Sequence, residues 1–448
     1  MEIELIFALG MFVCAIVALL AGYPVALTLG GVALIFGFIG VQLGLIPLPM
    51  LRLLPSRILG SMENQVLIAV PLFVLMGVIL ERSKVADDLL HTASRLLARV
   101  RGGLGYAVVI VGALLAASTG IVGATVITMT LIALPTMLRQ GYDPKLATGT
   151  IAASGTLGQI IPPSIVLILL ADAVSNANQS AAMRSGNGAG VVSVGDLFAG
   201  ALIPGLMLVG LYLLYLVVTA ILRPSASPAV SLEEETEPLT FSEIARSLGA
   251  PLALIIAVLG SILAGLASPT VASAIGAGGA LLLAGIRLAP QHGRRGDLAS
   301  IWASFVSLLL LGVLDNSIDM RENREEISTL SQDVNGLAAL ASIAFFGGLL
   351  AAARVLWRAN QFSDSLRSGV QITSMVFLIL IGASLFALVF RAYDGDHYVE
   401  ALLTSIPGGL WGALAITMLV MFILGFFLDF IEIVFVVVPI VAPPLIIL

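Results

Sequence analysis

The stretch that decides the fold runs from Leu146 to Leu170 and reads LATGTIAASGTLGQIIPPSIVLILL. It is long enough to span a bilayer, for which about 20 apolar residues suffice, yet its centre cannot be a regular helix. Pro162 and Pro163 remove two backbone donors, and Pro163 disfavours the helical conformation at Pro162. The segment therefore predicts a helix that is broken at membrane depth.

The residues around the break suit an ion site. Gly155 and Gly158 permit unusual backbone conformations, and hydroxyl groups are added by Ser154, Thr156 and Ser164. Because unpaired backbone groups are costly in lipid, such a segment has to be buried in protein or line a polar cavity. Discontinuous helices of this kind hold ions and substrates in secondary transporters. The alternative is a proline kink that serves packing alone.

The composition places the whole chain in a membrane. Hydrophobic residues make up 59% of it and charged residues 11%, against about 25% charged residues in soluble domains. The single cysteine, Cys14, excludes a disulfide framework. The three histidines, His91, His292 and His397, lie too far apart for a metal motif. No phosphate-binding Gly-Lys-Ser/Thr loop is present, so ATP hydrolysis is not expected.

Apolar runs predict a series of membrane helices. Residues 5–44 are too long for one span, and the expected break between two helices lies at Gly22 to Pro24. Residues 81–101 alternate basic and apolar side chains, which predicts an amphipathic helix, either in the membrane interface or solvated in the cytoplasm. The other expected spans lie near residues 66–80, 197–222, 249–266, 270–286, 300–316, 335–355 and 369–391.

Two long apolar stretches have small or polar centres. In residues 102–138, two short helices meeting at Ser118, Thr119 and Gly120 would form a re-entrant hairpin; the alternative is one long helix with a small-residue packing face. Residues 406–448 repeat this pattern. Their centre carries Asp429 and Glu432, acids expected on an ion or substrate path because a charge at the bilayer centre costs about 2.5–3.5 kcal/mol. Alternatively, both acids are solvated at the hairpin tip.

The distribution of basic residues predicts the topology. The loops at 223–246, 287–299 and 355–368 are expected in the cytoplasm, and those at 174–196, 317–334 and 392–406 outside. The N-terminus is then outside, and the two hairpins enter from opposite faces, as inverted repeats require. The predicted fold class is an all-α polytopic membrane protein with two re-entrant hairpins and broken helices. Its second repeat is expected to be incomplete, because no partner of the broken helix follows the second hairpin.

The sequence predicts five consecutive segments. They are N-terminal scaffold helices with an amphipathic arm (1–101), a first repeat core (102–222), a polar linker (223–247), scaffold helices with inserted spans (248–405) and a truncated second hairpin (406–448).

Several motifs resemble the large membrane subunit of tripartite ATP-independent periplasmic (TRAP) transporters. They are AASGTLGQIIPPS at 152–164, LFAGALIPG at 197–205 and GYDP at 141–144. Residues 64–80 and 425–429 look similar too. The string FLDFIE, which begins at position 427, resembles the branch assigned to mannitol or chloroaromatic compounds. The part of the chain between about 287 and 365 matches least and looks like an insertion.

The resemblance implies a sodium-driven importer of small organic acids in the bacterial inner membrane, working by an elevator motion. Its implied partners are a small four-helix membrane subunit and a periplasmic solute-binding protein, with no cofactor beyond sodium and no nucleic acid. The rival readings are a truncated, non-transporting subunit and an intramembrane hydrolase built on Asp429 and Glu432.

The resemblance also implies where sodium binds. The second sodium site would use Gly425 and Asp429 with residues that this chain does not contain. The broken helix itself would be formed around Gly158, Pro162, Pro163 and Ser164. The first site would comprise Ser118, Thr119, Gly120, Gly123, Ser154, Gly155, Thr156 and Pro162.

Overall fold

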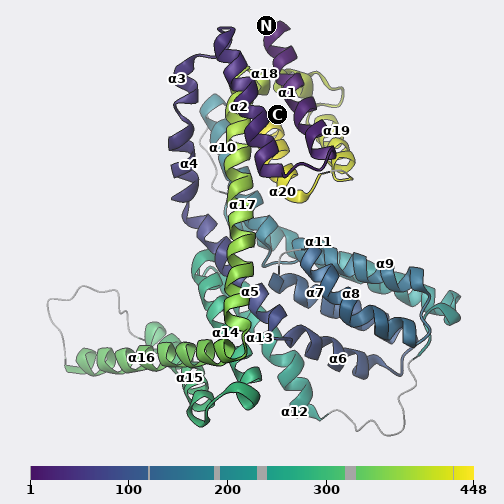
Figure 1. The fold of residues 1–448 in the computed structure, drawn as a ribbon, viewed down its shortest axis with the longest axis vertical. Coiled ribbons are helices and arrows are strands. Elements are labelled where there is room, and N and C mark those ends of the chain that lie inside the picture. The colour runs from purple at the N-terminus through teal and green to yellow at the C-terminus, as the bar shows by residue number, and fades with distance from the viewer. Residues whose placement is uncertain (1, 120–121, 186–191, 230–239, 318–328, 427) are drawn as a thin grey trace. The chain divides into compact units, whose positions relative to one another are not determined.

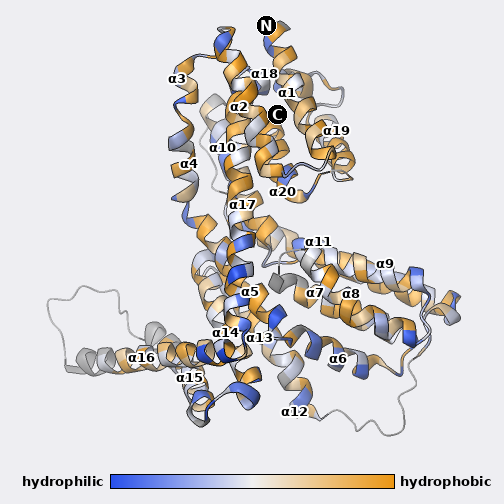
Figure 2. Cartoon of the chain, in the orientation of Figure 1, coloured by the Kyte–Doolittle hydropathy of each residue, from blue (hydrophilic) through white to orange (hydrophobic). Residues whose placement is uncertain are grey.

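The structure is a computed structural model that describes residues 2–119, 122–185, 192–229, 240–317, 329–426 and 428–448. These residues form helices and no strands (Figure 1), which confirms the all-α prediction. Ten of the described helices are long and apolar enough to cross a membrane, or eleven if the bent pair Gly395–Ser405 and Gly409–Leu424 makes one span. Apolar residues cover most of α1, α2, α11 and α19 (Figure 2), as lipid-facing helices require.

The first half of the chain contributes helices of very different lengths. They are α1 (Glu2–Leu20), α2 (Val25–Gln42), α3 (Leu48–Leu51), α4 (Leu54–Met62), the 3-10 segment η1 (Gln65–Ile68), α5 (Ala69–Arg82), α6 (Val85–Leu97), α7 (Gly103–Thr119), α8 (Val122–Arg139), α9 (Pro144–Thr156), the 3-10 segment η2 (Leu157–Gln159), α10 (Ile165–Ser185) and α11 (Val194–Leu222).

The second half begins with short segments and continues with long helices. They are η3 (Pro224–Ala226), α12 (Phe241–Ile244), the π-helical η4 (Ala245–Gly249), α13 (Ala250–Leu263), α14 (Pro269–His292), α15 (Arg295–Ser317), α16 (Thr329–Arg358), α17 (Gln361–Ala392), α18 (Gly395–Ser405), α19 (Gly409–Leu424), α20 (Phe430–Glu432), the π-helical η5 (Ile433–Val437) and α21 (Val438–Ile447).

The chain folds into two compact units, each assembled from segments far apart in sequence. Unit 1 contains Met1–Pro71, Ser164–Ile203 and Val370–Leu448, and unit 2 contains Leu72–Pro163 and Pro204–Gly369. The five consecutive segments expected from the sequence describe the order of the chain rather than its packing, and they stay a prediction. So do the sides of the membrane assigned to the loops.

In unit 1, α1 and α2 pack with α17. The expected break between the first two helices is confirmed, since Gly22 has a φ of +86° between them. The Tyr393 hydroxyl donates to the carbonyl of Phe36 at 2.6 Å, and the Tyr393 ring stacks on Phe7 with centroids 5.6 Å apart. A Cβ at Gly382 would lie 2.5 Å from the carbonyl oxygen of Ala26, so α17 approaches α2 backbone to backbone.

In unit 2, glycines of α14 let neighbouring helices come close. A Cβ at Gly276 would lie 2.7 Å from the sulfur of Met76 in α5, and one at Gly279 would lie 2.4 Å from Leu254 in α13. These glycines therefore serve close packing between helices. A separate apolar core joins α14, α15 and α16 through Leu282, Ile301, Ala351 and Ala352. The segment that looked like an insertion thus contains a helical pair packed on α14.

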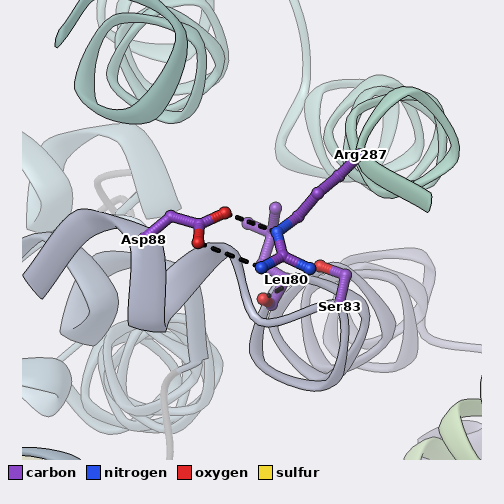
Figure 3. A network of polar contacts seen from close by, with 4 residues as sticks. All are labelled: Leu80, Ser83, Asp88 and Arg287. Carbon is purple, nitrogen blue, oxygen red and sulfur yellow. Dashed lines mark hydrogen bonds and ion pairs between the residues drawn. The ribbon is translucent and has the colours of Figure 1, made fainter. Parts of the chain in front are cut away.

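The expected amphipathic helix is α6, and protein covers much of its apolar face, although Leu96 is exposed. Leu89 and Leu90 are buried, and α6 packs against α7. On its polar side Asp88 pairs with Arg287 of α14: Nε donates to one carboxylate oxygen, and Nη2 donates to the other at 3.0 Å (Figure 3). This forked pair fixes α6 to α14 within unit 2.

Candidate functional site

The predicted break lies between α9 and α10. Asp143 caps α9, its side chain accepting a hydrogen bond from the backbone N–H of Lys145 at 2.7 Å, and Pro144 occupies the first helical position. The helix ends at Thr156, and α10 begins at Ile165. The interruption predicted from the two prolines is therefore present.

The prolines deprive particular carbonyls of their helical partners. In a continuous helix the carbonyl of Gly158 would accept a hydrogen bond from the N–H of residue 162, but Pro162 has no N–H. Pro163 removes the next helical donor in the same way. The N–H groups of Ile160 and Ile161 both turn back to the carbonyl of Leu157, at 3.0 Å each. Gly158, Pro162, Pro163 and Ser164 are buried. The break is thus a protein-lined segment of irregular backbone.

A helical hairpin packs on the first half of the broken helix. Helices α7 and α8 contact each other, and both contact α9 and η2. Ser118 and Thr119 lie in the last turn of α7, and the structure describes their backbone but not their side chains; Gly120 lies outside the described residues. Gly123 lies in the first turn of α8, exposed, with open space where a Cβ would be.

The hairpin and the broken helix meet at small residues. Ser154 is fully buried, and a Cβ at Gly112 of α7 would lie 2.7 Å from its Cβ. Gly155 faces α8, where a Cβ would lie 2.2 Å from Cγ2 of Val126. Close helix packing therefore uses two of the expected sodium-site residues.

The two hydroxyls that α9 contributes to the expected first site face different surroundings. Ser154 Oγ donates to the carbonyl of Ile151 at 2.9 Å, and Thr156 Oγ1 donates to that of Ala153 at 2.8 Å. Each of these oxygens keeps acceptor capacity for a cation. Ser154 is inaccessible to solvent, whereas Thr156 is exposed. Thr156 is therefore the better target for a test of ion binding.

The second apolar stretch also forms two helical arms in contact, α19 and the continuous run of α20, η5 and α21. Gly425 and Asp429 are exposed in the turn between them. Asp429 caps α20: its Oδ1 accepts from the N–H of Phe430 at 2.8 Å, and its own N–H donates to Glu432 at 3.2 Å. Glu432 is 6% exposed. The two acids therefore stabilise a helix start at the turn.

A second polar cluster, in unit 1, was not predicted from the sequence. Asn64 Nδ2 donates to Oδ1 of Asp172 at 2.6 Å, and Asn176 Nδ2 donates to Oδ2 at 3.2 Å. Asp172 lies within an apolar span, Ile165–Met183. An ionisable residue inside such a span is itself a functional signal, and it is the signal in the sequence that points to Asp172.

Comparisons with known proteins agree on one family. The family model described as "Tripartite ATP-independent periplasmic transporter, DctM component" matches residues 12–448. The chain is 33% identical over 270 residues to the C4-dicarboxylate TRAP transporter large permease protein DctM of Rhodobacter capsulatus, covering 60% of this chain and 58% of that protein.

Relatives with other named solutes match over similar lengths. The ectoine TRAP transporter large permease protein of Halomonas elongata is 30% identical over 257 residues, 57% of this chain and 54% of that protein. The sialic acid TRAP transporter large permease protein of Vibrio cholerae is 27% identical over 266 residues, 59% and 56% respectively. The chain thus spans a little over half the length of these curated relatives.

Proposed function

Because this chain belongs to the family of the DctM component of tripartite ATP-independent periplasmic transporters, we propose that it is the large membrane subunit of a sodium-coupled importer of small organic acids. The family is one of transporter permeases, so the chain is not an enzyme. This excludes the hydrolase built on Asp429 and Glu432. The solutes in the relatives' names, C4-dicarboxylates, ectoine and sialic acid, support a small carboxylated cargo.

The observation that carries the proposal is the interrupted helix packed against a helical hairpin. Between Thr156 and Ile165 the backbone leaves the helical hydrogen-bond pattern, and α7 and α8 pack on the segment that leads into this break. Carbonyl oxygens released from a helix coordinate sodium in secondary transporters. The first ion site would then draw on the hairpin turn, from Ser118 to Gly123, and on the end of α9. Gly425 and Asp429 would serve a second site in the same way.

The family name supports the rest of the assembly. A tripartite periplasmic system requires two further components, which we propose are a small four-helix membrane subunit and a periplasmic solute-binding protein in a bacterial inner membrane. The sodium gradient would supply the energy. The hairpin would move with its bound cargo in an elevator motion.

Sodium-driven uptake tests this proposal. Proteoliposomes containing the chain, the small subunit and the binding protein should accumulate solute when sodium is high outside, and a potassium gradient of equal size should not replace it. Thr156→Val removes an exposed hydroxyl of the expected site and should raise the sodium concentration needed for half-maximal uptake.

A matched control is available on the same helix. The Thr148 hydroxyl is also exposed and donates to a backbone carbonyl, that of Pro144, at 2.8 Å. Thr148→Val should leave the sodium dependence unchanged. Uptake that proceeds equally well without sodium would disprove the coupling.

A further inference from the structure

Unit 1 contains a polar cavity whose described lining includes none of the expected sodium-site residues. Its volume is about 480 Å3, within the range of about 300–1,000 Å3 typical of small-molecule sites. Its walls come from α4, α10, α17 and the second hairpin arm. Hydroxyl and amide side chains line it together with apolar ones. Such a lining is suited to a solute with several hydrogen-bonding groups.

Asp172 supplies one of the two charged groups of the described cavity lining. Asn64, which lies 108 positions earlier in the chain, and Asn176, one helical turn later, each donate an amide N–H to a different oxygen of this carboxylate. These contacts hold the group in one orientation. A carboxylate has about four acceptor positions, so Asp172 can accept further hydrogen bonds from a bound solute.

The other charged group of the lining is Arg391, in the last turn of α17. Its Nε lies 4.0 Å from Oδ2 of Asp396, and its side chain is 29% exposed. A guanidinium has five N–H donors in a fork that matches a carboxylate in two-point contact. It can therefore bind the carboxylate of a solute as well as face Asp396.

We propose that this cavity binds a solute with a single carboxylate, paired with Arg391, and hydroxyl groups that donate to Asp172. Asp172 and Arg391 are the charged residues among the described lining. A second carboxylate on the solute would meet Asp172, and like charges repel. The cavity thus selects a hydroxylated monocarboxylate over a C4-dicarboxylate. The inference rests on the proposed function, because it names the class of cargo.

Protection of a cysteine in the cavity wall tests the proposal without transport. Ser384 lines the cavity from α17 and is half-buried. Ser384→Cys is placed in a Cys14→Ala background, which removes the chain's single native thiol. The full chain is held in lipid nanodiscs at constant sodium, and labelling by a small thiol reagent is timed. Gluconate should slow labelling, and succinate should need at least about tenfold more to do the same, a difference of about 1.4 kcal/mol.

Charge variants in the Ser384→Cys, Cys14→Ala background test the roles of Arg391 and Asp172. Arg391→Gln should abolish protection by gluconate. Asp172→Asn should bring the two half-protecting concentrations together, because succinate no longer meets a like charge. The controls Glu63→Gln and Arg52→Gln alter exposed charges of unit 1 outside the cavity lining and should change neither value.

Two results would overturn the inference: no protection by gluconate, or equal protection by gluconate and succinate in the parent Ser384→Cys protein. Because the parent retains both charged groups, a folding defect in the charge variants cannot produce either result. Gluconate protection combined with sodium-independent uptake would disprove the sodium coupling alone. Sodium-driven uptake without selective protection would disprove this inference alone.

Discussion

Gly155 lies at a close approach of α9 to α8. An added Cβ would lie 2.2 Å from Cγ2 and 3.3 Å from Cα of Val126, so the helices would have to separate. We expect Gly155→Ala to lower the free energy of unfolding by about 1–3 kcal/mol, the usual cost of overpacking. Thermal unfolding of the detergent-solubilised protein measures it. Gly149→Ala, on the same helix with open space around it, should be neutral or stabilising. Equal stability of the two variants would contradict the packing described.

The Asp88–Arg287 pair should contribute modestly to stability. Its geometry is forked, but the side chains are 43% and 30% exposed, so solvent screens the attraction. A double-mutant cycle with Asp88→Asn and Arg287→Gln should give a coupling energy of about 1 kcal/mol. Arg287→Lys keeps the charge and loses the fork, so it should fall between wild type and Arg287→Gln. A coupling energy near zero in thermal unfolding would show that the pair does not stabilise the contact between α6 and α14.

At the scale of elements, α15 and α16 are held together by a close approach at Gly348. A Cβ there would lie 2.3 Å from Cβ of Ser304 and 2.6 Å from the carbonyl oxygen of Ser300. Gly348→Val should push the two helices apart and make α15 and α16 easier for a protease to cleave. Gly347→Val, one residue earlier with nothing near it, should not. Cleavage rates of the two variants, measured side by side, test whether the close approach at Gly348 holds α15 and α16 together.

The same two helices are also joined by Asp297, where α15 begins and α16 ends. It accepts the backbone N–H of Arg294 and Nη1 of Arg358, both at 2.8 Å. These donors, the backbone N–H first, hold the pKa of the Asp297 carboxyl below its usual value despite its burial. A lowered folded-state pKa gives stability that is complete above the unfolded value of about 3.9 and is lost as pH falls through the folded one. The thermal midpoint should therefore drop more between pH 5 and pH 3 in wild type than in Asp297→Asn.

Elements with a local cause could be predicted from the sequence. Pro162 and Pro163 indicate the end of a helix, and Gly22 before Pro24 indicates the break between α1 and α2. Contacts that join distant segments could not. Nothing near Asn64 indicates that it meets Asp172, because that contact depends on how the helices pack. For the same reason the sequence indicates only one role for Ser154, because its hydroxyl fits an ion site. Its position against Gly112, which makes it a packing residue, depends on how α7 and α9 pack.

At the scale of the whole molecule, a bound coupling ion should stabilise the fold. A ligand that binds the folded state alone adds about 1.4 kcal/mol at ten times its dissociation constant. Sodium chloride should therefore raise the thermal midpoint of the full chain more than choline chloride at equal ionic strength. Thr156→Val should shift this response to higher sodium, and Thr148→Val should not. Identical midpoints in the two salts would argue against a sodium site in this chain.

The discontinuous build of unit 1 has a consequence for biogenesis. The hydrogen bond from Tyr393 to Phe36 joins residues 357 positions apart. A ribosome adding roughly 5–20 residues per second needs about 20–70 s to make the intervening chain. During that time α1 and α2 already lie in the bilayer without α17. The insertion machinery or the lipid must hold them until the third segment of unit 1 emerges. Premature release of the nascent chain would therefore leave α1 and α2 without α17, the partner that completes their core.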